Sequence, residues 1–305
     1  MAIIKNPLTI ISSGSGVQAQ LDGILDGSIT GDLTSNATYV RNNIFQGCTR
    51  LTSITLPSAS YIDTQAFYSC TGLTSASGAN VDSIRTDAFR GCSHLQSANF
   101  PECTYLSDYA FSNDGGLATI NFPKLTTIGQ NVFYGTAIPS ASFPLATQLG
   151  QYAFYNCTSL TSASFPSLAR DISAYAFSGC NHLSSIYFPL ATAVHTYAFY
   201  TCHALTSVDL PAVQYVQGQG FRYCSGLTSV TLNSCTTLLT RAFADCSASM
   251  HLYLGANTVC SISNVNAITT GTTVHVPADL IASYQTASNW VTLYNNNAIT
   301  FVAIT

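Results

Sequence analysis

The side chains of this sequence that could do chemistry are its histidines, cysteines, acidic residues and tyrosines. Histidine serves as a general base and as a metal ligand, and His195 could approach His203 from a neighbouring segment. A metal site needs three or four ligands in a fixed geometry, however, and the 13 acidic residues form no repeating pair. Motifs for a phosphate loop, a metal-binding Cys-x-x-Cys or a nucleophile elbow are missing. We therefore predict no enzyme, no catalytic residue, no metal and no cofactor.

The cysteines form the most regular pattern. Of the 11 cysteines, most lie three residues after a phenylalanine: Cys48, Cys70, Cys92, Cys157, Cys180, Cys202, Cys224 and Cys246. This recurrence predicts an inward column of small side chains, since free cysteine is among the most buried residue types. Parallel side chains in a column point the wrong way for disulfides. Cys260 lies outside the column and is expected to be the most exposed thiol.

The tyrosines are the candidates for a binding site. The predicted binding residues are Tyr109, Tyr152, Tyr175, Tyr197, Tyr134, Tyr155 and Tyr200. They lie two residues before or one residue after a phenylalanine, and strand alternation would point the preceding set outward. Tyrosine combines a large contact area with one polar group, which suits recognition of proteins and of sugars. The alternative is that these rings only pair across strands and cover a sheet.

A repeat must position all of these residues. Ten phenylalanines recur at steps of 22 residues, with one step of 21 and one of 23. They are Phe45, Phe67, Phe89, Phe111, Phe133, Phe154, Phe177, Phe199, Phe221 and Phe243. Such a period indicates a solenoid whose coils bury their apolar faces against one another.

Each coil is expected to carry two short strands and little helix. Alternation in segments such as Ser53-Ile54-Thr55-Leu56 predicts the first strand. A second extended piece is expected from an Ile or Val, five residues before the next phenylalanine, to an Ala-Phe pair. Strands of successive coils would form parallel sheets with a spacing of about 4.8 Å.

The repeat resembles a known family. Leu227-x-x-Val230-x-Leu232-x-x-Cys235-x-x-Leu238 is similar to the leucine-rich repeat consensus, and the Ala-Phe-x-x-Cys ending resembles the BspA-like subgroup of bacterial cell-surface repeats. The slot that often holds asparagine in leucine-rich repeats holds other residues here, such as Ala59 and Val81. The resemblance implies a mainly β leucine-rich repeat solenoid that attaches to host or cell-surface macromolecules, ending in a small α+β cap.

Four regions are predicted. Residues 1–16 are an N-terminal docking segment with a Gly/Ser linker, 17–38 an N-terminal cap, 39–256 the repeats and 257–305 a C-terminal cap. Caps are needed because open solenoid ends expose apolar surface and strand edges. The alternative for residues 1–11 is a disordered segment or part of the cap. Within the C-terminal cap, a helix is expected after Pro277, with Trp290 as its anchor, and a strand at 298–302.

The repeat is least regular in its middle. Asp114 and Thr136 replace the column cysteine, and one residue is lost near Ile138 and Pro139. Residues 113–116, Asn-Asp-Gly-Gly, predict a turn. A local bend or bulge is expected there.

Composition limits the function. Charged residues make up 7% of the chain and the net charge is −4, so nucleic acid is excluded as a partner. No apolar run reaches the roughly 18 residues of a membrane span, and the N-terminus does not resemble a signal peptide.

These observations predict a non-enzymatic, surface-displayed binding or adhesion solenoid. We expect a phage virion protein, tail-associated or a decoration protein, that recognises a host-cell surface protein or glycan and docks to the virion through its N-terminal segment. A bacterial cell-surface adhesin and a purely structural virion subunit without a ligand are the alternatives. The expected location is the virion or an extracellular surface, and a homo-oligomer is compatible with the low charge.

Overall fold

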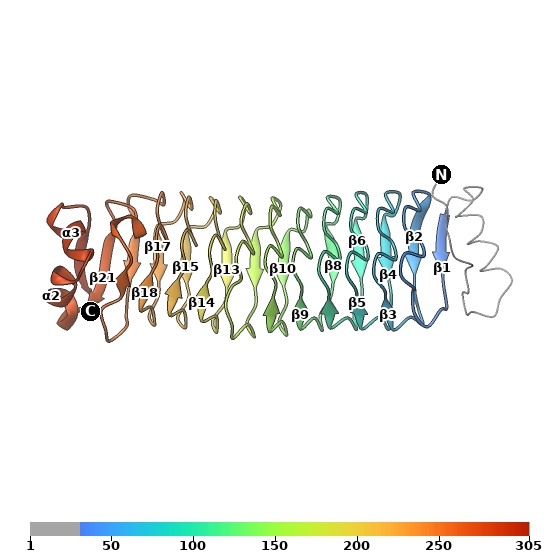
Figure 1. Ribbon diagram of the computed structural model, residues 1–305, viewed down its shortest axis with the longest axis horizontal. Helices are drawn as coiled ribbons and strands as arrows, with labels where there is room; N and C mark the ends of the chain where they lie inside the picture. Colours follow the sequence, from blue (N-terminus) through green and yellow to red (C-terminus); the bar gives the residue numbers. More distant parts are fainter. Residues whose placement is uncertain (1–30, 305) are drawn as a thin grey trace. The chain divides into compact units, whose positions relative to one another are not determined.

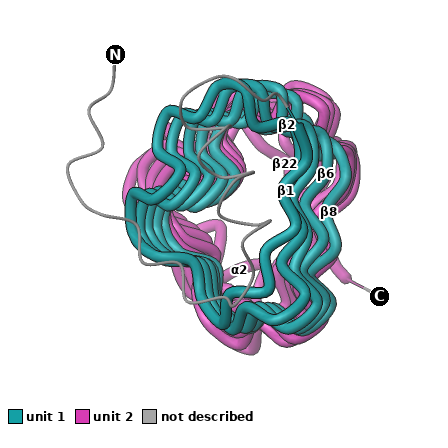
Figure 2. Tube along the Cα trace, turned by 90° about the vertical axis from the view of Figure 1, so that its right-hand side faces the viewer, with its two compact units in different colours: residues 1–138 teal, residues 139–305 magenta. Residues whose placement is uncertain are grey.

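Residues 31–304 are described by a computed structural model. The chain divides into two compact units, Met1–Ile138 and Pro139–Thr305 (unit 1 and unit 2; Figure 2). Each unit consists of stacked coils with short parallel strands (Figure 1). The predicted mainly β solenoid with a small C-terminal α+β region is confirmed. The predicted docking segment, its linker and most of the predicted N-terminal cap lie outside the described residues.

Unit 1 has two parallel sheets. We call the sheet whose strands have three to five residues the wide sheet, and the sheet whose strands have two residues the narrow sheet. The wide sheet contains β1 (Gly31–Thr34), β2 (Leu51–Thr55), β4 (Ser75–Ser77), β6 (Ser97–Asn99) and β8 (Thr119–Asn121). The narrow sheet contains β3 (Tyr61–Ile62), β5 (Ser83–Ile84), β7 (Tyr105–Leu106) and β9 (Thr127–Ile128). Partners in register come from equivalent repeat positions, as in Ile54 opposite Ala76. The repeat thus fixes the pairing register.

Unit 2 is built from the same kind of two-strand coil. On its wide side lie β10 (Ser140–Ser142), β12 (Ser162–Ser164), β13 (Ser185–Tyr187), β15 (Ser207–Asp209), β17 (Ser229–Thr231), β19 (His251–Tyr253), β21 (Thr273–Pro277) and β22 (Thr300–Ile304). On its narrow side lie β11 (Gln148–Leu149), β14 (Ala193–Val194), β16 (Tyr215–Val216), β18 (Thr237–Leu238) and β20 (Ser261–Ile262). Serine and threonine occupy many of the outward strand positions.

The Ala-Phe pair is not extended, contrary to expectation. The narrow-side strand ends at the Ile or Val, and the chain then forms turns around each repeat phenylalanine. Residues two before and two after that phenylalanine (positions −2 and +2) take left-handed backbone conformations, as at Tyr175 (φ 58°) and Gly179 (φ 80°). The N–H groups of Tyr175, Phe177 and Gly179 then bond to carbonyls of the next coil at 3.1, 2.8 and 2.9 Å. The third side of each coil is therefore a stack of turns.

The repeat phenylalanines form the core of each unit. In unit 2, Phe177 stacks between Phe154 (ring centroids 5.2 Å apart) and Phe199 (5.3 Å). A second phenylalanine column, including Phe165 and Phe188, meets the first edge-on. All five rings are fully buried, as the repeat predicts.

The cysteine column lies inside, as predicted, and it also donates hydrogen bonds. The Cys202 thiol donates to the carbonyl of Phe177 in the preceding coil (3.2 Å), and Cys224 does the same to Phe199 (3.1 Å). In a later coil the Thr269 hydroxyl takes this place and donates to the Phe243 carbonyl at 2.7 Å. The side chain at the column position must therefore be small and must also be able to donate a hydrogen bond.

Cys260 is buried, so the prediction of an exposed thiol is wrong. It precedes β20, which pairs with β18 and extends the coil beyond the last repeat phenylalanine. Its sulfur lies 3.6 Å from that of Cys235, and its carbonyl accepts a 2.6 Å hydrogen bond from Trp290 Nε1. Half-buried Cys48 is instead the most accessible cysteine.

Cysteine alkylation should follow this order. We expect N-ethylmaleimide to label Cys48 first in the native protein, and slowly, because burial raises the pKa of its thiol to about 11 and the thiolate is the nucleophile. Peptide mapping by mass spectrometry measures the order, with the urea-unfolded chain as the control in which all cysteines react. Faster labelling of Cys260 than of Cys48 would contradict the placement of Cys260.

The C-terminal region combines short helices with two strands. After β21 the chain forms a 3-10 turn (η2, Ala278–Leu280) and α2 (Ile281–Thr286), where a helix is predicted, followed by α3 (Trp290–Asn295) and β22 (Figure 1). A further 3-10 turn, η1 (Val265–Ala267), precedes β21. Trp290 anchors the helices, since it contacts Cys260 and the buried Tyr284 ring (5.6 Å). No helix among residues 31–304 is long and apolar enough to cross a membrane.

Candidate binding surface

The histidines do not assemble the pair that their spacing suggested. His195 Nε2 lies 2.7 Å from Asp171 Oδ2, whereas His203 Nδ1 lies 3.2 Å from Ser225 Oγ. Burial acts to raise the pKa of Asp171, but hydrogen bonds from His195 and Thr192 outweigh it and leave that pKa lowered. No hydroxyl or thiol in the described chain is in hydrogen-bond contact with His195, and no cluster of three or more His, Cys, Asp or Glu forms there. The His195–Asp171 pair therefore resembles a surface ion pair rather than an activated nucleophile site.

The predicted tyrosines at position −2 form a ladder in unit 2. Tyr175 stacks on Tyr152 with ring centroids 4.6 Å apart and planes 9° from parallel, and on Tyr197 at 4.7 Å and 14°. All three side chains are partly exposed. We call Tyr152, Tyr175 and Tyr197 the tyrosine ladder.

Three further rings flank the ladder. Tyr155 contacts Tyr152 at 5.7 Å, and Tyr200 meets Tyr197 edge-on at 5.2 Å. Tyr200 in turn meets Tyr223 edge-on at 5.4 Å. We call the ladder and these flanking rings together the tyrosine surface: Tyr152, Tyr155, Tyr175, Tyr197, Tyr200 and Tyr223. It spans four successive coils of unit 2.

The other two predicted residues lie in unit 1. Tyr109 is also at position −2, and its ring lies 4.9 Å from the guanidinium carbon of Arg90. Tyr134 follows Phe133 and is partly exposed. The structure thus gathers five of the seven candidates on unit 2 and gives Tyr109 a cationic neighbour instead of a second tyrosine.

The outward direction of the ladder comes from backbone conformation, not from strand alternation. Tyr152, Tyr175 and Tyr197 have φ angles of 57°, 58° and 59°. This left-handed region is unfavourable for residues with a Cβ atom by roughly 1–2 kcal/mol. The bonds between turns of neighbouring coils hold the backbone there, so each ring is fixed at the same place in its coil.

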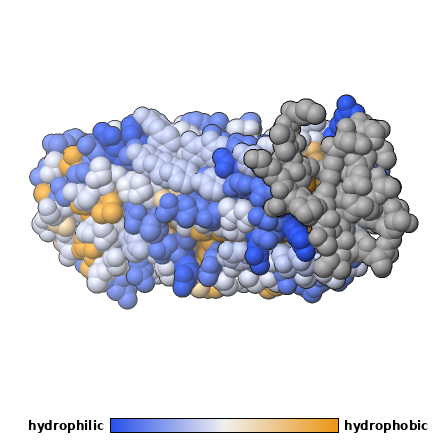
Figure 3. Space-filling view, turned by 45° about the vertical axis from the view of Figure 1, so that its right-hand side comes forward, coloured by the Kyte–Doolittle hydropathy of each residue, from blue (hydrophilic) through white to orange (hydrophobic). Residues whose placement is uncertain are grey.

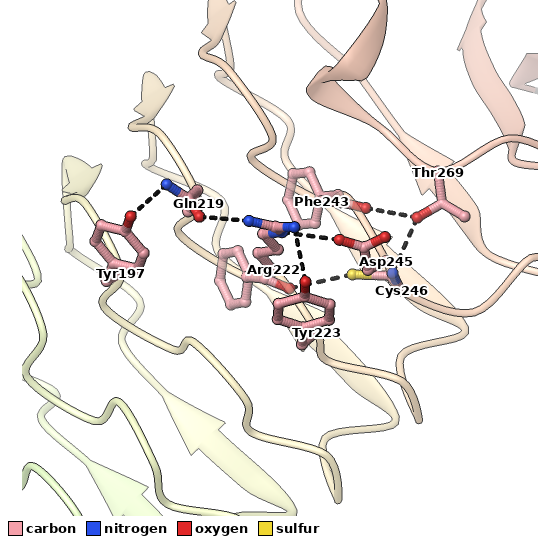
Figure 4. Close-up of polar contacts among 9 residues, drawn as sticks. Tyr197, Gln219, Arg222, Tyr223, Phe243, Asp245, Cys246 and Thr269 are labelled. Carbon is pink, nitrogen blue, oxygen red and sulfur yellow. Dashed lines mark hydrogen bonds and ion pairs between the residues drawn. The ribbon is translucent and has the colours of Figure 1, made fainter.

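A polar relay extends the ladder toward the C-terminal coils (Figure 4). Gln219, at position −2 of the next coil, donates to the Tyr197 hydroxyl and accepts from Arg222 at 2.9 Å. Arg222 also donates to Asp245 at 2.8 Å and to the Tyr223 hydroxyl at 2.7 Å. Gln219, Arg222 and Tyr223 are not among the residues predicted from the sequence, because that prediction used only tyrosines at position −2 or directly after a repeat phenylalanine. Alignment of every coil on its phenylalanine would have found them, since Gln219 and Arg222 occupy the same positions as the predicted tyrosines.

The central ring of the ladder presents its edge and hydroxyl rather than an open face. Both faces of Tyr175 are covered, by Tyr152 and by Tyr197. Burial and the neighbouring tyrosines raise the pKa of Tyr175, which keeps its phenol neutral, able both to donate and to accept a hydrogen bond. The face of the molecule seen in Figure 3 is mostly hydrophilic or neutral, with only small hydrophobic spots. The tyrosine surface therefore offers hydroxyls for hydrogen bonds and ring edges for packing, with the Arg222–Asp245 ion pair beside Tyr223.

Comparisons with known proteins identify the repeat. A model of the BspA type Leucine rich repeat region, in 6 copies, matches residues 29–139 and 147–264. A leucine-rich repeat protein of T. pallidum is 26% identical, with 58% of this chain and 83% of that chain covered and a TM-score of 0.48. A leucine rich cell surface protein of Faecalibacterium prausnitzii A2-165 is 18% identical (76% and 88% covered, TM-score 0.35), and the pneumococcal vaccine antigen PcpA 15% (91% and 85%, TM-score 0.43). No curated protein matches the chain.

Proposed function

The chain belongs to the BspA-type leucine-rich repeat family, and from this premise we propose that it is a non-enzymatic binding protein whose tyrosine surface recognises a protein. Leucine-rich repeats of this type form a protein-binding fold of bacterial surface proteins. The observation that carries the proposal is the ladder of Tyr152, Tyr175 and Tyr197, stacked at 4.6 and 4.7 Å. Its rings are placed by the repeat itself.

The stacking favours a protein ligand over a glycan. A sugar ring binds an aromatic side chain by lying flat on an open ring face, and both faces of Tyr175 are covered. A protein surface can instead pack on the ring edges and bond to the row of hydroxyls, which is the way interface tyrosines act. Glycan recognition, which the sequence also suggested, would have to use rings other than Tyr175, such as the flanking Tyr155 and Tyr200.

Pre-organisation supports binding by this surface. A side chain that is mobile before association loses about 0.5–1.5 kcal/mol of rotamer entropy on binding. Neighbouring rings and the left-handed backbone already restrict Tyr175, so little of that cost remains. Tyrosine is also among the residues that contribute most to binding energy in protein interfaces.

We include display on an outer surface in the proposal. Family membership supports a cell surface in general terms. Display on a phage virion, with host-cell recognition and attachment through residues 1–16, is the more specific form. Mass spectrometry of purified particles from a lysate of the source strain tests it, and a chain found only in the cell-envelope fraction would contradict it.

Substitution of the ladder should abolish binding to cells without unfolding the protein. We choose the triple change Tyr152→Asn, Tyr175→Asn and Tyr197→Asn, because asparagine tolerates left-handed backbone conformations. We expect at least a tenfold loss of affinity, equivalent to about 1.4 kcal/mol, in flow cytometry of fluorescently labelled protein on a panel of bacterial and animal cells.

The matched control is Tyr187→Asn. Tyr187 lies in β13 of the same unit and is 57% exposed, but it is on the wide side of the coil, so binding should be unchanged. Protease treatment of the cells should remove binding and glycosidase treatment should not. Equal losses for ladder and control would contradict the proposed surface, glycosidase sensitivity would indicate a glycan ligand, and no binding to any cell would favour a structural role.

A further inference from the structure

A second cluster of chemically active side chains lies on the wide side of unit 2, away from the turns that carry the tyrosine surface. His251 begins β19 and His275 is at the centre of β21, and the two strands pair in parallel. In this register His275 is opposite Tyr253, and His251 is opposite Thr273. The two histidines are therefore diagonal neighbours on one face of the sheet, and their 24-residue separation is one repeat step of 22 plus two residues.

We propose that His251 and His275 bind a divalent transition-metal ion of the class that includes Zn²⁺ and Ni²⁺. His251 Nδ1 lies 3.0 Å from His275 Nε2. Two nitrogens that each lie about 2.0–2.1 Å from one metal ion, at a coordination angle of about 90–110°, are separated by roughly 2.9–3.4 Å. The observed separation falls in that range. The two nitrogens are at hydrogen-bond distance from each other, so a bound ion would replace this hydrogen bond, with the rings turned so that both lone pairs face the ion.

The surroundings hold the rings in this arrangement. The Tyr253 ring stacks on His275 with centroids 4.2 Å apart and planes 12° from parallel. The backbone pairing of β19 with β21 fixes the distance between the strands that carry the two histidines. A ligand pair that is already in place loses little conformational freedom on metal binding, which favours affinity.

The chemistry of the donor atoms also suits a metal. The side chains in contact with His275 are those of His251 and Tyr253. Imidazole nitrogens are ligands that suit Zn²⁺ and Ni²⁺.

Two protein ligands leave coordination positions open. The described residues contain no group of three or more His, Cys, Asp or Glu that could complete the site, and His251 is exposed to solvent. The remaining ligands would be water or a donor atom of a bound partner. The site departs from the sequence prediction of no metal, which required three or four ligands from this chain.

Metal binding to the purified full-length chain tests the proposal. After treatment with a chelator and its removal, the protein is titrated with Ni²⁺ or Zn²⁺ alone and binding is followed by isothermal titration calorimetry. We expect one bound equivalent at neutral pH, lost in both His251→Gln and His275→Gln, and weakened at least tenfold in the native chain at about pH 5, because protons compete with the metal for imidazole nitrogens in acid.

The matched control is His182→Gln. His182 is an exposed histidine of the same unit whose Nδ1 contacts only the Thr158 carbonyl, at 2.6 Å. Its substitution should leave the bound equivalent intact, and thermal melts should show all three variants folded. The proposal is overturned if the native chain binds no metal, if binding survives in both single variants, or if the control loses it equally. These outcomes are independent of cell binding by the tyrosine surface.

Discussion

Phe177→Ala should lower the free energy of unfolding of unit 2 by about 3–5 kcal/mol. The Phe177 ring is fully buried, stacks on Phe154 and Phe199, and meets Phe165 and Phe188 edge-on. Its removal leaves a cavity at the boundary with both neighbouring coils. Because a repeat unit is stabilised mainly by its neighbours, both boundaries lose stability. Urea unfolding followed by circular dichroism measures the change.

Two variants make this test specific. Phe177→Leu keeps most of the apolar volume and should cost clearly less. Tyr187→Ala removes an aromatic ring from the surface of the same unit, where it is 57% exposed, and should change stability by less than about 0.5 kcal/mol. A Phe177→Ala protein as stable as the native chain would mean that the repeat register is wrong.

The buried positions could be predicted because burial restricts them in every coil. Phe177, Cys202, Leu205 and Val194 are all fully buried, and each belongs to a slot that the repeat marks. The step of 22 residues therefore suffices to identify the core and the parallel pairing. The repeat does not predict the burial of Cys260, because the coil that contains it is longer than 22 residues. Cys260 therefore falls outside the regular spacing.

The stack of turns does not follow from the alternation of apolar and polar residues, because the strand ends at the Ile or Val and not at the Ala-Phe pair. The sequence carried a usable signal at position +2, where Gly47, Gly91, Gly135 and Gly179 recur and Asn113 and Asn156 replace them. Glycine and asparagine are the residues that best tolerate left-handed conformations. Their recurrence predicts a turn around each phenylalanine. Position −2 shows a weaker signal. It holds Asn43 and Asn131 but also residues such as Tyr175 and Arg241, so the backbone is needed to establish its conformation.

The composition of the candidate surface was predictable, but its geometry was not. Tyr152, Tyr175 and Tyr197 each lie two residues before a repeat phenylalanine and therefore at the same place in successive coils, and this much follows from the repeat. Whether rings in successive coils stack face to face or splay apart depends on side-chain angles that the left-handed backbone sets. That geometry separates stacked rings from an open aromatic platform, and it supports the protein rather than the glycan among the two ligands that the sequence left open.

Asp114 is the residue of unit 1 that least fits its position. It occupies the cysteine slot, where the Cys92 thiol of the preceding coil donates to the Phe67 carbonyl at 3.1 Å. An ionised carboxylate has no proton to donate. The Asp114 side chain is completely buried, and neither of its oxygens has a hydrogen-bond partner in the described residues. Burial raises the pKa of Asp114 well above its usual range, an effect that the nearby Cys92 and Gly91 amides offset only in part.

Unit 1 should consequently lose stability as the pH rises. Below the unfolded-state pKa of about 3.9, Asp114 is protonated in both states and its contribution to stability is greatest. Above that pH the unfolded chain releases the proton while the folded chain retains it, so stability falls by up to about 1.4 kcal/mol per pH unit until the raised folded-state pKa is reached. Urea midpoints measured from about pH 4 to about pH 8 follow this change.

Two substitutions separate titration from packing at this site. Asp114→Asn keeps the shape and removes the titrating group, so the difference from the native chain should grow in favour of the variant as the pH rises, while contributions of other carboxyls cancel. Asp114→Cys also restores the thiol donor of the column and should stabilise unit 1 at pH 7 by on the order of 1–3 kcal/mol, the cost of an unsatisfied buried polar group. A difference that stays constant with pH would mean that Asp114 titrates alike in the folded and unfolded chain, and that its carboxyl reaches water. Equal stabilisation by the Asn and Cys variants would instead assign the cost to the carboxyl charge alone, leaving the thiol donor without a share in the stability of the column.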